Sequence, residues 1–457
     1  MANVLEKICA NKAEELVKLK QQLPLDSFIK TLTPSDRSMF AALSQPNAGF
    51  ILECKKASPS KGLIRENFDL DEIIAAYSPY AAAISVLTDK KYFSGSFDYL
   101  RYVRERVSQP VLNKDFFIDP YQVHLARYHN ADAILLMLSV LDDTTYTEMA
   151  NLAERYRLDV LTEVSNEQEA HRACRLGAKI IGINNRDLRD LSTNLNTTFR
   201  LAPLLPKDAI LISESGIYTH SDVRKLAPVV NGFLVGSSLM AEQNVAKAVQ
   251  KLLYGKVKIC GITNKEDGIK VQQSPASYAG LIFAEKSPRC ISLSQAKQIT
   301  DNAPQDYVGV FVNQPVEFLL EAVTRLNLSA VQLHGGEDQD YIDQLRQQLP
   351  IDVEIWQAKG VTTRLPELDN TNVDYFLLDC QIGQQTGGTG QSFNWQLLSQ
   401  LADKSSLILA GGLSPQNIRS AAIIGAAILD VNSGVESQPG QKDVTRISEL
   451  FSELRTY

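Results

Sequence analysis

Short, almost continuous apolar runs alternate with amphipathic segments along most of the chain. Runs rich in Val, Ile and Leu and bounded by Gly or polar residues are typical of strands buried on both faces of a parallel sheet, and amphipathic segments are typical of the helices that cover it. The first half of the sequence contains eight such runs. We expect strands at residues 49–56, 81–88, 110–116, 133–138, 159–164, 180–186, 209–216 and 232–239.

The same alternation starts again at residue 256. Just before it, the segment Leu252-Leu-Tyr-Gly255 has the pattern of a helix that ends on a C-cap glycine. Eight further strands are expected at residues 256–263, 278–284, 307–312, 330–335, 353–359, 375–380, 407–413 and 427–434. Two sets of eight βα units favour two tandem (β/α)8 barrels, with domains at residues 1–255 and 256–457, over the alternative of two open α/β sheets.

A helical extension is expected before the first strand, within residues 1–46. An amphipathic helical pattern is indicated by apolar residues near helical spacing, namely Leu5, Ile8, Leu16, Leu19 and Leu23. A second helix is expected to begin at Thr33-Pro34-Ser35-Asp36, because proline is favoured at the first helical position.

Composition and charge exclude several classes of protein. The 457 residues exceed the size at which one core stops growing, about 250–300 residues, so two domains are expected. A net charge of −7 argues against a general nucleic-acid surface, and no run is long and apolar enough to span a membrane or to act as a signal peptide. The six cysteines form no CxxC pair and there are only five histidines, so we expect reduced thiols in a cytoplasmic protein and no metal centre.

Polar side chains gather at the predicted carboxyl ends of the strands, which is where barrels carry their active sites. A carboxylate and a lysine at one strand end often form only a salt bridge. Strands that all end in charged or hydroxyl groups, however, are rare without a shared ligand. In the first half these residues are Glu53, Lys55, Lys114, Glu163, Asn184, Arg186 and Glu214.

Two turns of the first half have the composition of a phosphate site. Ser215-Gly216 and Gly236-Ser237 follow the seventh and eighth predicted strands, the usual phosphate-binding position of a barrel. Small residues let backbone N–H groups approach phosphate oxygens. The hydroxyls of Ser58 and Ser60 are expected to add donors over the same pocket.

The second half carries a different set of polar strand ends. Cys260 and Asp379 sit on the first and sixth predicted strands, positions that can face each other across a barrel mouth. A thiolate base opposite a carboxylic acid is a pair that moves protons on a small substrate, although a cysteine at a strand end is by itself more often inert core. The other candidates are Arg289, His334, Gly387, Gly388, Gly390, Gly411, Gly412, Ser433 and Gly434.

These motifs resemble two known families, in the order in which they occur. FILECKKASPSKG, SVLTDKKYFSGS, VLNKDF, LTEV, IGINNRDL, LISESGI and LVGSSLM resemble indole-3-glycerol phosphate synthase. KICGIT, SPR, VQLHG, LLDC with TGGTG, AGGLSPQN and LDVNSGVE resemble phosphoribosylanthranilate isomerase. The resemblance covers nearly the whole chain and implies a fused enzyme of tryptophan biosynthesis that acts on small phosphorylated substrates, as a monomer and without a cofactor.

The resemblance implies a role for each candidate in the second half. Asp379 is similar to the general acid that opens the ribose ring of phosphoribosylanthranilate, and Cys260 to the general base that takes the C2′ proton in this Amadori rearrangement. Arg289 and His334 would hold the anthranilate end. The phosphate would be bound by Gly387, Gly388, Gly390, Gly411, Gly412, Ser433 and Gly434.

In the first half the resemblance implies ring closure with release of CO₂ and water. Lys114 is similar to the general acid on the ketone oxygen and Glu163 to the acid/base group of the dehydration, while Lys55 would pair with the substrate carboxylate. Which of the two lysines donates the proton stays open. Glu53, Asn184 and Glu214 would orient these groups, and the phosphate contacts would be Arg186, Ser215, Gly216, Gly236 and Ser237.

Two other classes of function fit parts of the pattern. A phosphosugar aldolase would use a strand-end lysine to form a Schiff base, which borohydride would trap on Lys55 or Lys114. A non-catalytic sensor of phosphometabolites would bind its ligand tightly without turnover. The acid/base sets in both halves argue against the sensor.

Overall fold

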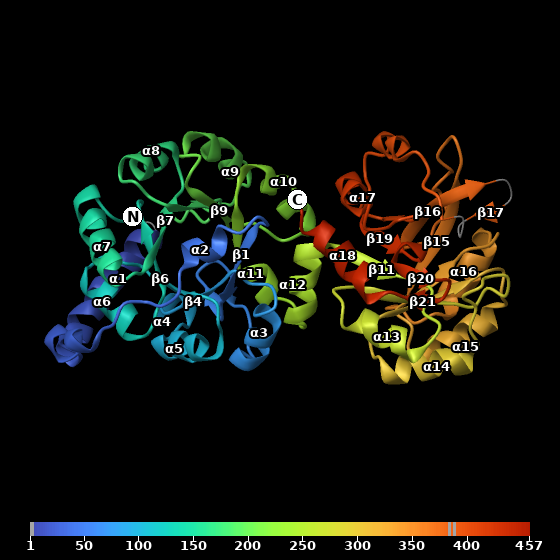
Figure 1. Ribbon diagram of the computed structural model, residues 1–457, viewed down its shortest axis with the longest axis horizontal. Helices are drawn as coiled ribbons and strands as arrows, with labels where there is room; N and C mark the ends of the chain where they lie inside the picture. The colour runs from blue at the N-terminus through green and yellow to red at the C-terminus, as the bar shows by residue number, and fades with distance from the viewer. Residues whose placement is uncertain (1–3, 383–384, 387–389) are drawn as a thin grey trace. The chain divides into compact units, whose positions relative to one another are not determined.

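The computed structural model describes residues 4–382, 385–386 and 390–457, and within them the chain forms two compact units. The first unit ends at Val249 and the second covers Gln250–Thr456. In each unit parallel strands are surrounded by helices (Figure 1). The predicted pair of tandem (β/α)8 barrels is confirmed.

The first unit is a closed barrel in the order β1-β10-β9-β8-β7-β6-β5-β4. Strand β1 pairs in parallel with both β4 and β10, which closes the ring and brings every carboxyl end to one mouth. Each predicted strand is present, but most predicted ends ran too far into the loops. The strands are β1 (Gly49–Cys54), β4 (Ala83–Leu87), β5 (Val111–Lys114), β6 (Ala133–Met137), β7 (Asp159–Val164), β8 (Ile180–Asn184), β9 (Ile210–Glu214) and β10 (Gly232–Val235).

Helices cover the outside of this barrel, and a short hairpin of β2 (Ala57–Ser58) and β3 (Gly62–Leu63) follows β1. The helix α12 (Val245–Tyr254), which contains the boundary between the two units, ends on Gly255, whose φ of +74° is the left-handed conformation expected of a C-cap glycine. The other helices of this unit are α1 (Val4–Gln22), α2 (Met39–Leu43), α3 (Leu70–Tyr77), α4 (Lys90–Phe93), α5 (Phe97–Arg106), α6 (Tyr121–Tyr128), α7 (Asp143–Arg155), α8 (Glu167–Arg175), α9 (Asn196–Leu201), α10 (His220–Leu226) and α11 (Ser237–Met240).

The predicted helix start at Thr33–Asp36 is wrong. The backbone N–H of Ser35 donates to the carbonyl oxygen of Tyr156 (2.7 Å), and the Ser35 hydroxyl donates to the buried carboxylate of Asp132 (2.7 Å). These contacts bind the segment to the barrel in place of a helical turn. The helix α2 begins only at Met39, with Ser38 as its N-cap.

The helix α1 packs against the barrel rather than extending into solvent. Leu5 and Ile8 belong to the apolar cluster that fills the barrel. One turn further on, the buried Lys12 lies 2.8 Å from Asp89 and 2.9 Å from Asp115. An ion pair buried on both sides and a shared apolar cluster hold this helix beside the carboxyl ends of β4 and β5.

The second unit repeats the architecture. Strands β15 and β16 pair in parallel and so close the ring β11-β12-β13-β14-β15-β16-β18-β19 within the described residues. Its interior is filled by an apolar cluster around the fully buried Trp356. The strands are β11 (Lys256–Ile259), β12 (Tyr278–Ile282), β13 (Tyr307–Phe311), β14 (Ala330–Leu333), β15 (Glu354–Val361), β16 (Tyr375–Ile382), β18 (Leu407–Leu409) and β19 (Ile428–Val431).

Two antiparallel additions sit beyond the strand ends of this barrel. The short β17 (Gln385–Thr386) pairs back on β16, and β20 (Glu436–Gln438) pairs with β21 (Gln441–Lys442) after the last barrel strand. Neither was predicted from the sequence. The helices of this unit are α13 (Lys265–Gln272), α14 (Leu293–Asn302), α15 (Val316–Leu326), α16 (Gln339–Gln348), α17 (Ile418–Ile424) and α18 (Val444–Leu454).

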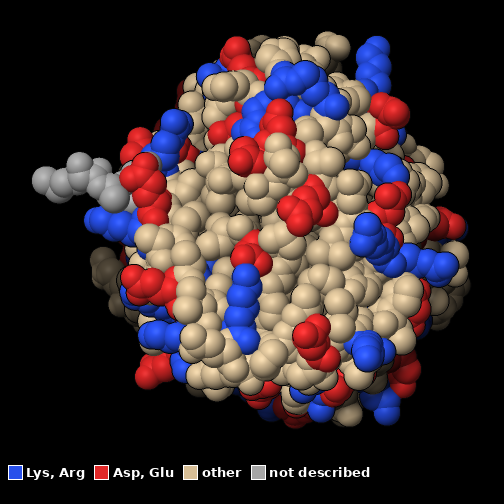
Figure 2. Space-filling model, turned by 90° about the vertical axis from the view of Figure 1, so that its left-hand side faces the viewer, with Lys and Arg blue, Asp and Glu red and all other residues tan. Residues whose placement is uncertain are grey.

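Two general features bear on function. Among the described residues, no helix has the length and apolar character that crossing a membrane requires. Positive and negative side chains are interspersed over the face of the molecule shown in Figure 2.

Candidate active sites

Lys114 is the centre of the mouth of the first unit. Its ammonium at the end of β5 lies 2.5 Å from Glu214 Oε2 and 3.7 Å from Glu163 Oε2, across the barrel on β9 and β7. Burial alone would lower the pKa of Lys114, but the carboxylates of Glu214, Glu163 and Glu53 raise it above its ordinary value. Lys114 is therefore a charged proton donor held among carboxylates.

Glu163 is a candidate proton carrier of the same mouth. Burial, with the neighbouring charge of Glu214, raises the pKa of Glu163 well above its ordinary value. Asn184 Nδ2 donates to Glu163 Oε1 at 3.0 Å and fixes that carboxyl group. A carboxyl group with a raised pKa can give up and take back a proton near neutral pH.

A second lysine pairs with a second carboxylate at the end of β1. Lys55 Nζ lies 2.5 Å from Glu53 Oε1 and donates to Ser237 Oγ at 3.4 Å. Burial opposes the charge of Glu53, but the ammonium groups of Lys55 and Lys114 hold the pKa of Glu53 below its ordinary value. This carboxylate therefore stays ionised between two cations.

The loops after β8, β9 and β10 complete this mouth. Ser215 and Gly216 both have positive φ, +66° and +77°, which turns the chain sharply as it leaves β9. Arg186 donates from Nη1 to the Ser60 hydroxyl. Every candidate residue of the first half lines one cavity: Glu53, Lys55, Ser58, Ser60, Lys114, Glu163, Asn184, Arg186, Glu214, Ser215, Gly216, Gly236 and Ser237.

In the second unit, Cys260 follows β11 and is buried at the mouth. Burial raises the pKa of the Cys260 thiol, while the ammonium groups of Lys258 and Lys442 act to lower it. Asp379, on β16, is buried as well, and burial raises its pKa to about 7. These are a thiol that becomes a strong base once ionised and a carboxyl group that keeps its proton up to neutral pH.

The buried Lys258 connects these two groups and was missed in the sequence. Its ammonium donates to Asp430 Oδ2 at 3.0 Å and to Gln332 Oε1 at 2.7 Å, and its charge acts on both Cys260 and Asp379. The signal was available, because side chains two positions apart on a strand point to the same face. A lysine two residues before Cys260 therefore points into the barrel.

Arg289 and His334 lie in loops of the same mouth. Arg289 forms a bidentate ion pair with Glu436, with Nη2 2.6 Å from Oε2. Nδ1 of His334 lies 3.1 Å from Nε2 of Gln332, the residue that also accepts from Lys258. Glu436 was not among the sequence candidates.

The structure brings several of the predicted glycine and serine loops together. A Cβ added to Gly412 would lie 2.7 Å from the carbonyl oxygen of Gly390, and one added to Gly390 would lie 3.9 Å from Ser433 Oγ. Gly411 borders Asp379, since its added Cβ would lie 3.1 Å from Oδ1. Gly434 leaves no room for a side chain beside the carbonyl oxygen of Leu413. The candidates Gly387 and Gly388 lie outside the described residues.

Gly261 is required at its position for two reasons, which can be measured separately. Its φ is +78°, and an added Cβ would lie 2.6 Å from Arg289 Cδ. Gly425 has a similar φ of +82° with nothing within 4 Å of an added Cβ. We expect Gly425→Ala to lower the free energy of unfolding of the second unit by about 1–3 kcal/mol, from backbone strain alone.

Gly261→Ala should lower that free energy further, because the clash with Arg289 adds to the strain. Denaturant unfolding of both variants checks this difference. Equal losses would show that Arg289 moves aside freely and that Gly261 serves only the turn.

Comparison with known proteins matches each unit to a family. The family model of indole-3-glycerol phosphate synthase matches residues 5–252, and that of N-(5'phosphoribosyl)anthranilate (PRA) isomerase matches residues 257–453. The chain is 55% identical to the tryptophan biosynthesis protein TrpCF of Vibrio cholerae, covering 100% of this chain and 97% of that protein. It is 50% identical to the TrpCF protein of Salmonella typhi, covering 100% of both. The chain therefore belongs to the family of bifunctional tryptophan biosynthesis proteins, in which an indole-3-glycerol phosphate synthase barrel precedes a PRA isomerase barrel.

Proposed function

We propose that the two mouths catalyse consecutive reactions through the residues described above, the second unit acting first. The chain is both a PRA isomerase and an indole-3-glycerol phosphate synthase. The isomerase converts PRA to carboxyphenylaminodeoxyribulose phosphate (CdRP), and the synthase converts CdRP to indole-3-glycerol phosphate. The observation that carries the assignment of residues is that each mouth holds its own buried acid/base set.

In the isomerase we assign Asp379 as the general acid and Cys260 as the general base. Asp379 protonates the ring oxygen of PRA, which opens the ribose ring and leaves an iminium group at C1′. The thiolate of Cys260 then removes the proton from C2′, and the resulting enolamine becomes the ketone of CdRP. Lys258 supports the base, because its charge favours the thiolate over the thiol.

Substrate binding in the isomerase is assigned to two regions. Arg289 and His334 contact the anthranilate end. The phosphate is bound where Gly390, Gly412 and Ser433 approach one another, since backbone N–H groups without side chains in front of them make an anion site. Gly387, Gly388, Gly411 and Gly434 complete this assignment.

In the synthase we assign Lys114 as the general acid on the ketone oxygen of CdRP. Its ammonium is fixed between Glu214 and Glu163, where a developing alkoxide would receive its proton. The aromatic carbon that bears the carboxylate attacks this carbonyl carbon, and CO₂ leaves. Lys55 pairs with that carboxylate before it is lost.

The dehydration that completes the indole ring is assigned to Glu163. Its raised pKa lets it carry a proton at neutral pH, which it gives to the departing hydroxyl group. Glu53, Asn184 and Glu214 orient the two lysines and Glu163 through the contacts described above. The phosphate contacts are Ser58, Ser60, Arg186, Ser215, Gly216, Gly236 and Ser237.

We further propose that the domain boundary lies between residues 255 and 256, at the end of α12, and that the chain acts as a monomer in the cytoplasm. All six cysteines are free thiols, which supports a reducing compartment. Proton transfers by these side chains suffice for both reactions, so neither is assigned a cofactor. Size-exclusion chromatography with light scattering tests the oligomeric state.

The test of the overall assignment supplies PRA to the purified chain and follows both products in time. CdRP should appear first and indole-3-glycerol phosphate after it. PRA that is consumed without formation of indole-3-glycerol phosphate would contradict the assignment of the first unit. PRA that is not consumed would contradict the assignment of the second.

The pH dependence of the isomerase follows from two raised pKa values. The reactive enzyme needs Asp379 protonated and Cys260 ionised. Below pH about 7 Asp379 is protonated, and the thiolate fraction of Cys260 grows with pH. Above pH about 7 the fraction of protonated Asp379 falls as fast as the thiolate fraction of Cys260 rises, so their product stays level. Once the thiol is fully ionised, only the loss of protonated Asp379 continues and the rate falls. We therefore expect kcat/KM to rise to pH about 7, stay level, and fall above the raised pKa of the thiol.

Asp379→Asn should remove the bend at pH about 7 and lower kcat/KM about 10²–10⁴-fold, the range of a general acid. The remaining activity should rise with pH up to the pKa of the thiol. Asp369→Asn, at an exposed loop position, is the matched control and should keep the wild-type profile. An Asp379→Asn profile that still bends at pH about 7 would assign that ionisation to another group.

A further inference from the structure

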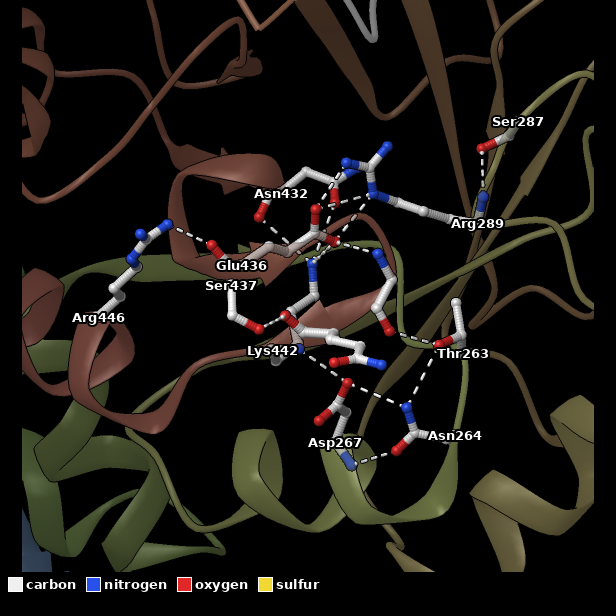
Figure 3. Close-up of polar contacts among 12 residues, drawn as sticks. Thr263, Asn264, Asp267, Ser287, Arg289, Asn432, Glu436, Ser437, Lys442 and Arg446 are labelled. Carbon is white, nitrogen blue, oxygen red and sulfur yellow. Dashed lines mark hydrogen bonds and ion pairs between the residues drawn. The ribbon is translucent and has the colours of Figure 1, made fainter.

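A buried ionic cluster beside Cys260 contains no group to which a proton transfer is assigned above. It consists of Arg289, Glu436 and Lys442 (Figure 3). Glu436 and Lys442 are cross-strand neighbours on the hairpin of β20 and β21, and Arg289 reaches them from the loop after β12. The side chains are 12%, 3% and 0% exposed for Arg289, Glu436 and Lys442, so the charges act in a poorly screened environment.

The carboxylate of Glu436 is fully occupied. Arg289 donates from Nε to Oε1 at 2.9 Å and from Nη2 to Oε2 at 2.6 Å. Lys442 Nζ donates to Oε1 at 2.7 Å, and the backbone N–H of Gly440 adds a bond of 3.2 Å. One carboxylate is therefore shared by two cations.

The two cations differ in the hydrogen-bond donors that remain available to a ligand. The ammonium of Lys442 uses its donors on Glu436 Oε1, on Asn432 Oδ1 (3.1 Å) and on the Asn432 carbonyl oxygen (3.3 Å). Arg289 donates from Nε and Nη2 to Glu436, and within the described residues its Nη1 has no hydrogen-bond partner. Only Arg289 can present this cluster's charge to a ligand.

The cluster carries one positive charge in excess. The other acidic groups packed near it have cations of their own, because Asp267 pairs with Lys270 at 2.8 Å and Asp430 with Lys258 at 3.0 Å. Two cations against one carboxylate leave a net charge of +1 within a mostly buried site. Such a charge is stabilised by an anion that enters from the mouth.

The position of Arg289 fixes which part of a ligand it meets. Its stem crosses directly over Gly261, where an added Cβ would lie 2.6 Å from Arg289 Cδ and 2.7 Å from Asn432 Oδ1. Gly261 is the residue after Cys260. A substrate whose C2′ proton reaches the thiolate therefore has its neighbouring groups beside the Arg289 guanidinium.

We propose that Lys442 is a positioning residue for substrate binding, which acts through Glu436 and Arg289. Glu436 holds the guanidinium in place, and Lys442 neutralises Glu436 so that the positive charge of Arg289 remains available to a substrate carboxylate. The inference rests on the proposed function, in which Arg289 contacts the anthranilate end of PRA. Without Lys442, the charge of Glu436 cancels that of Arg289 and the carboxylate loses its partner.

The test uses charge balance, with four variants of the full chain. Lys442→Met should raise KM for PRA about tenfold, since a tenfold affinity change corresponds to loss of one modest charge interaction. It should lower kcat by a smaller factor, through loss of one of the two ammonium groups that favour the Cys260 thiolate. Lys442→Arg keeps the charge and should keep KM. Glu436→Gln/Lys442→Met removes one charge of each sign, restores the net charge of +1, and should bring KM back to within about threefold of wild type.

Two inhibitors distinguish a loss of positive charge at Arg289 from a general distortion of the isomerase site. Reduced CdRP carries both a carboxylate and a phosphate, whereas ribulose 5-phosphate carries only the phosphate. Lys442→Met should weaken inhibition by reduced CdRP about tenfold and leave inhibition by ribulose 5-phosphate unchanged. Glu436→Gln alone does not depend on how well Lys442→Met folds. Its amide oxygen still accepts from the Arg289 guanidinium and no carboxylate cancels the charge of Arg289, so this variant should not weaken inhibition by reduced CdRP.

The role of Lys442 would be overturned if KM of the double variant were as high as that of Lys442→Met or higher. Equal weakening of inhibition by reduced CdRP and by ribulose 5-phosphate would overturn it as well. A weaker reduced CdRP complex in Glu436→Gln would do the same. Failure of the proposed function gives a different result, because wild-type protein would then leave PRA unchanged. Thermal unfolding of every variant, followed by circular dichroism, shows whether the second unit, which holds the cluster, has folded.

Discussion

Replacing Cys260 by alanine is expected to abolish isomerisation of PRA and leave ring closure of CdRP at the wild-type rate. The thiolate is the base assigned to the C2′ proton, and loss of a general base lowers kcat about 10²–10⁴-fold. The second unit should stay folded, because Cys260 is a small buried side chain whose replacement removes one sulfur atom. The measurement is the initial rate of each reaction, with PRA and CdRP supplied separately.

The control for this variant is Cys174→Ala. The Cys174 thiol belongs to α8, outside both mouths, and donates to the carbonyl oxygen of Leu204. The Cys174→Ala variant should leave the rates of isomerisation and of ring closure unchanged. Isomerisation that survives in Cys260→Ala would remove the thiol from the mechanism, and loss of ring closure in folded protein would contradict two separate sites.

Lys114→Ala is expected to have the opposite effect. Ring closure should fall about 10²–10⁴-fold through loss of the general acid, while isomerisation keeps its rate. The variant also leaves Glu214 and Glu163 facing each other without the cation that lies 2.5 Å from Glu214. One of the two carboxyl groups will then take up a proton, so a loss of stability in the first unit accompanies the loss of activity.

Lys207→Ala, at an exposed position between α9 and β9, is the control and should change neither rate nor stability. Thermal unfolding gives the transition temperature of Lys114→Ala and so measures its loss of stability. Assays well below that temperature then measure its loss of activity separately. Ring closure at more than about a tenth of the wild-type rate would move the acid role from Lys114 to Lys55.

The strand pattern was predictable because it depends on local chemistry that repeats. Buried parallel strands need apolar side chains on both faces, so Ile180–Asn184 and Tyr307–Phe311 stand out in the sequence. Their ends were less predictable, because polar residues occur both at strand ends and in the loops that follow, as Asn184 ends β8 whereas Arg186 already belongs to the loop. The start of α2 was misplaced because the binding of Ser35 to Asp132 and Tyr156 is a tertiary contact with no local signal.

The residues of the mouths were predictable where their position at a strand end was itself informative. Glu53, Lys114 and Glu163 are polar residues at the ends of apolar strands, and the closed barrel brings them together. Lys258 was missed because a lysine within a strand was not read as pointing inward, although its alternation with Cys260 carried that information.

Glu436 and Lys442 could not be found in this way. They lie beyond the last barrel strand, on a hairpin whose pairing depends on the turn at Gly440 (φ +80°) and on contacts with Arg289. Charged residues there resemble an exposed loop in the sequence. Only the structure shows that Lys442 is buried and that the two cations share one carboxylate.

The most direct test of two independent sites in one chain is to mix the two inactive variants. Cys260→Ala and Lys114→Ala proteins, each given PRA alone, should form no indole-3-glycerol phosphate. Their mixture should form it, because Lys114→Ala supplies CdRP and Cys260→Ala closes the ring. A mixture that stays inactive, while each variant keeps its own remaining reaction, would contradict two sites that work independently through a released intermediate.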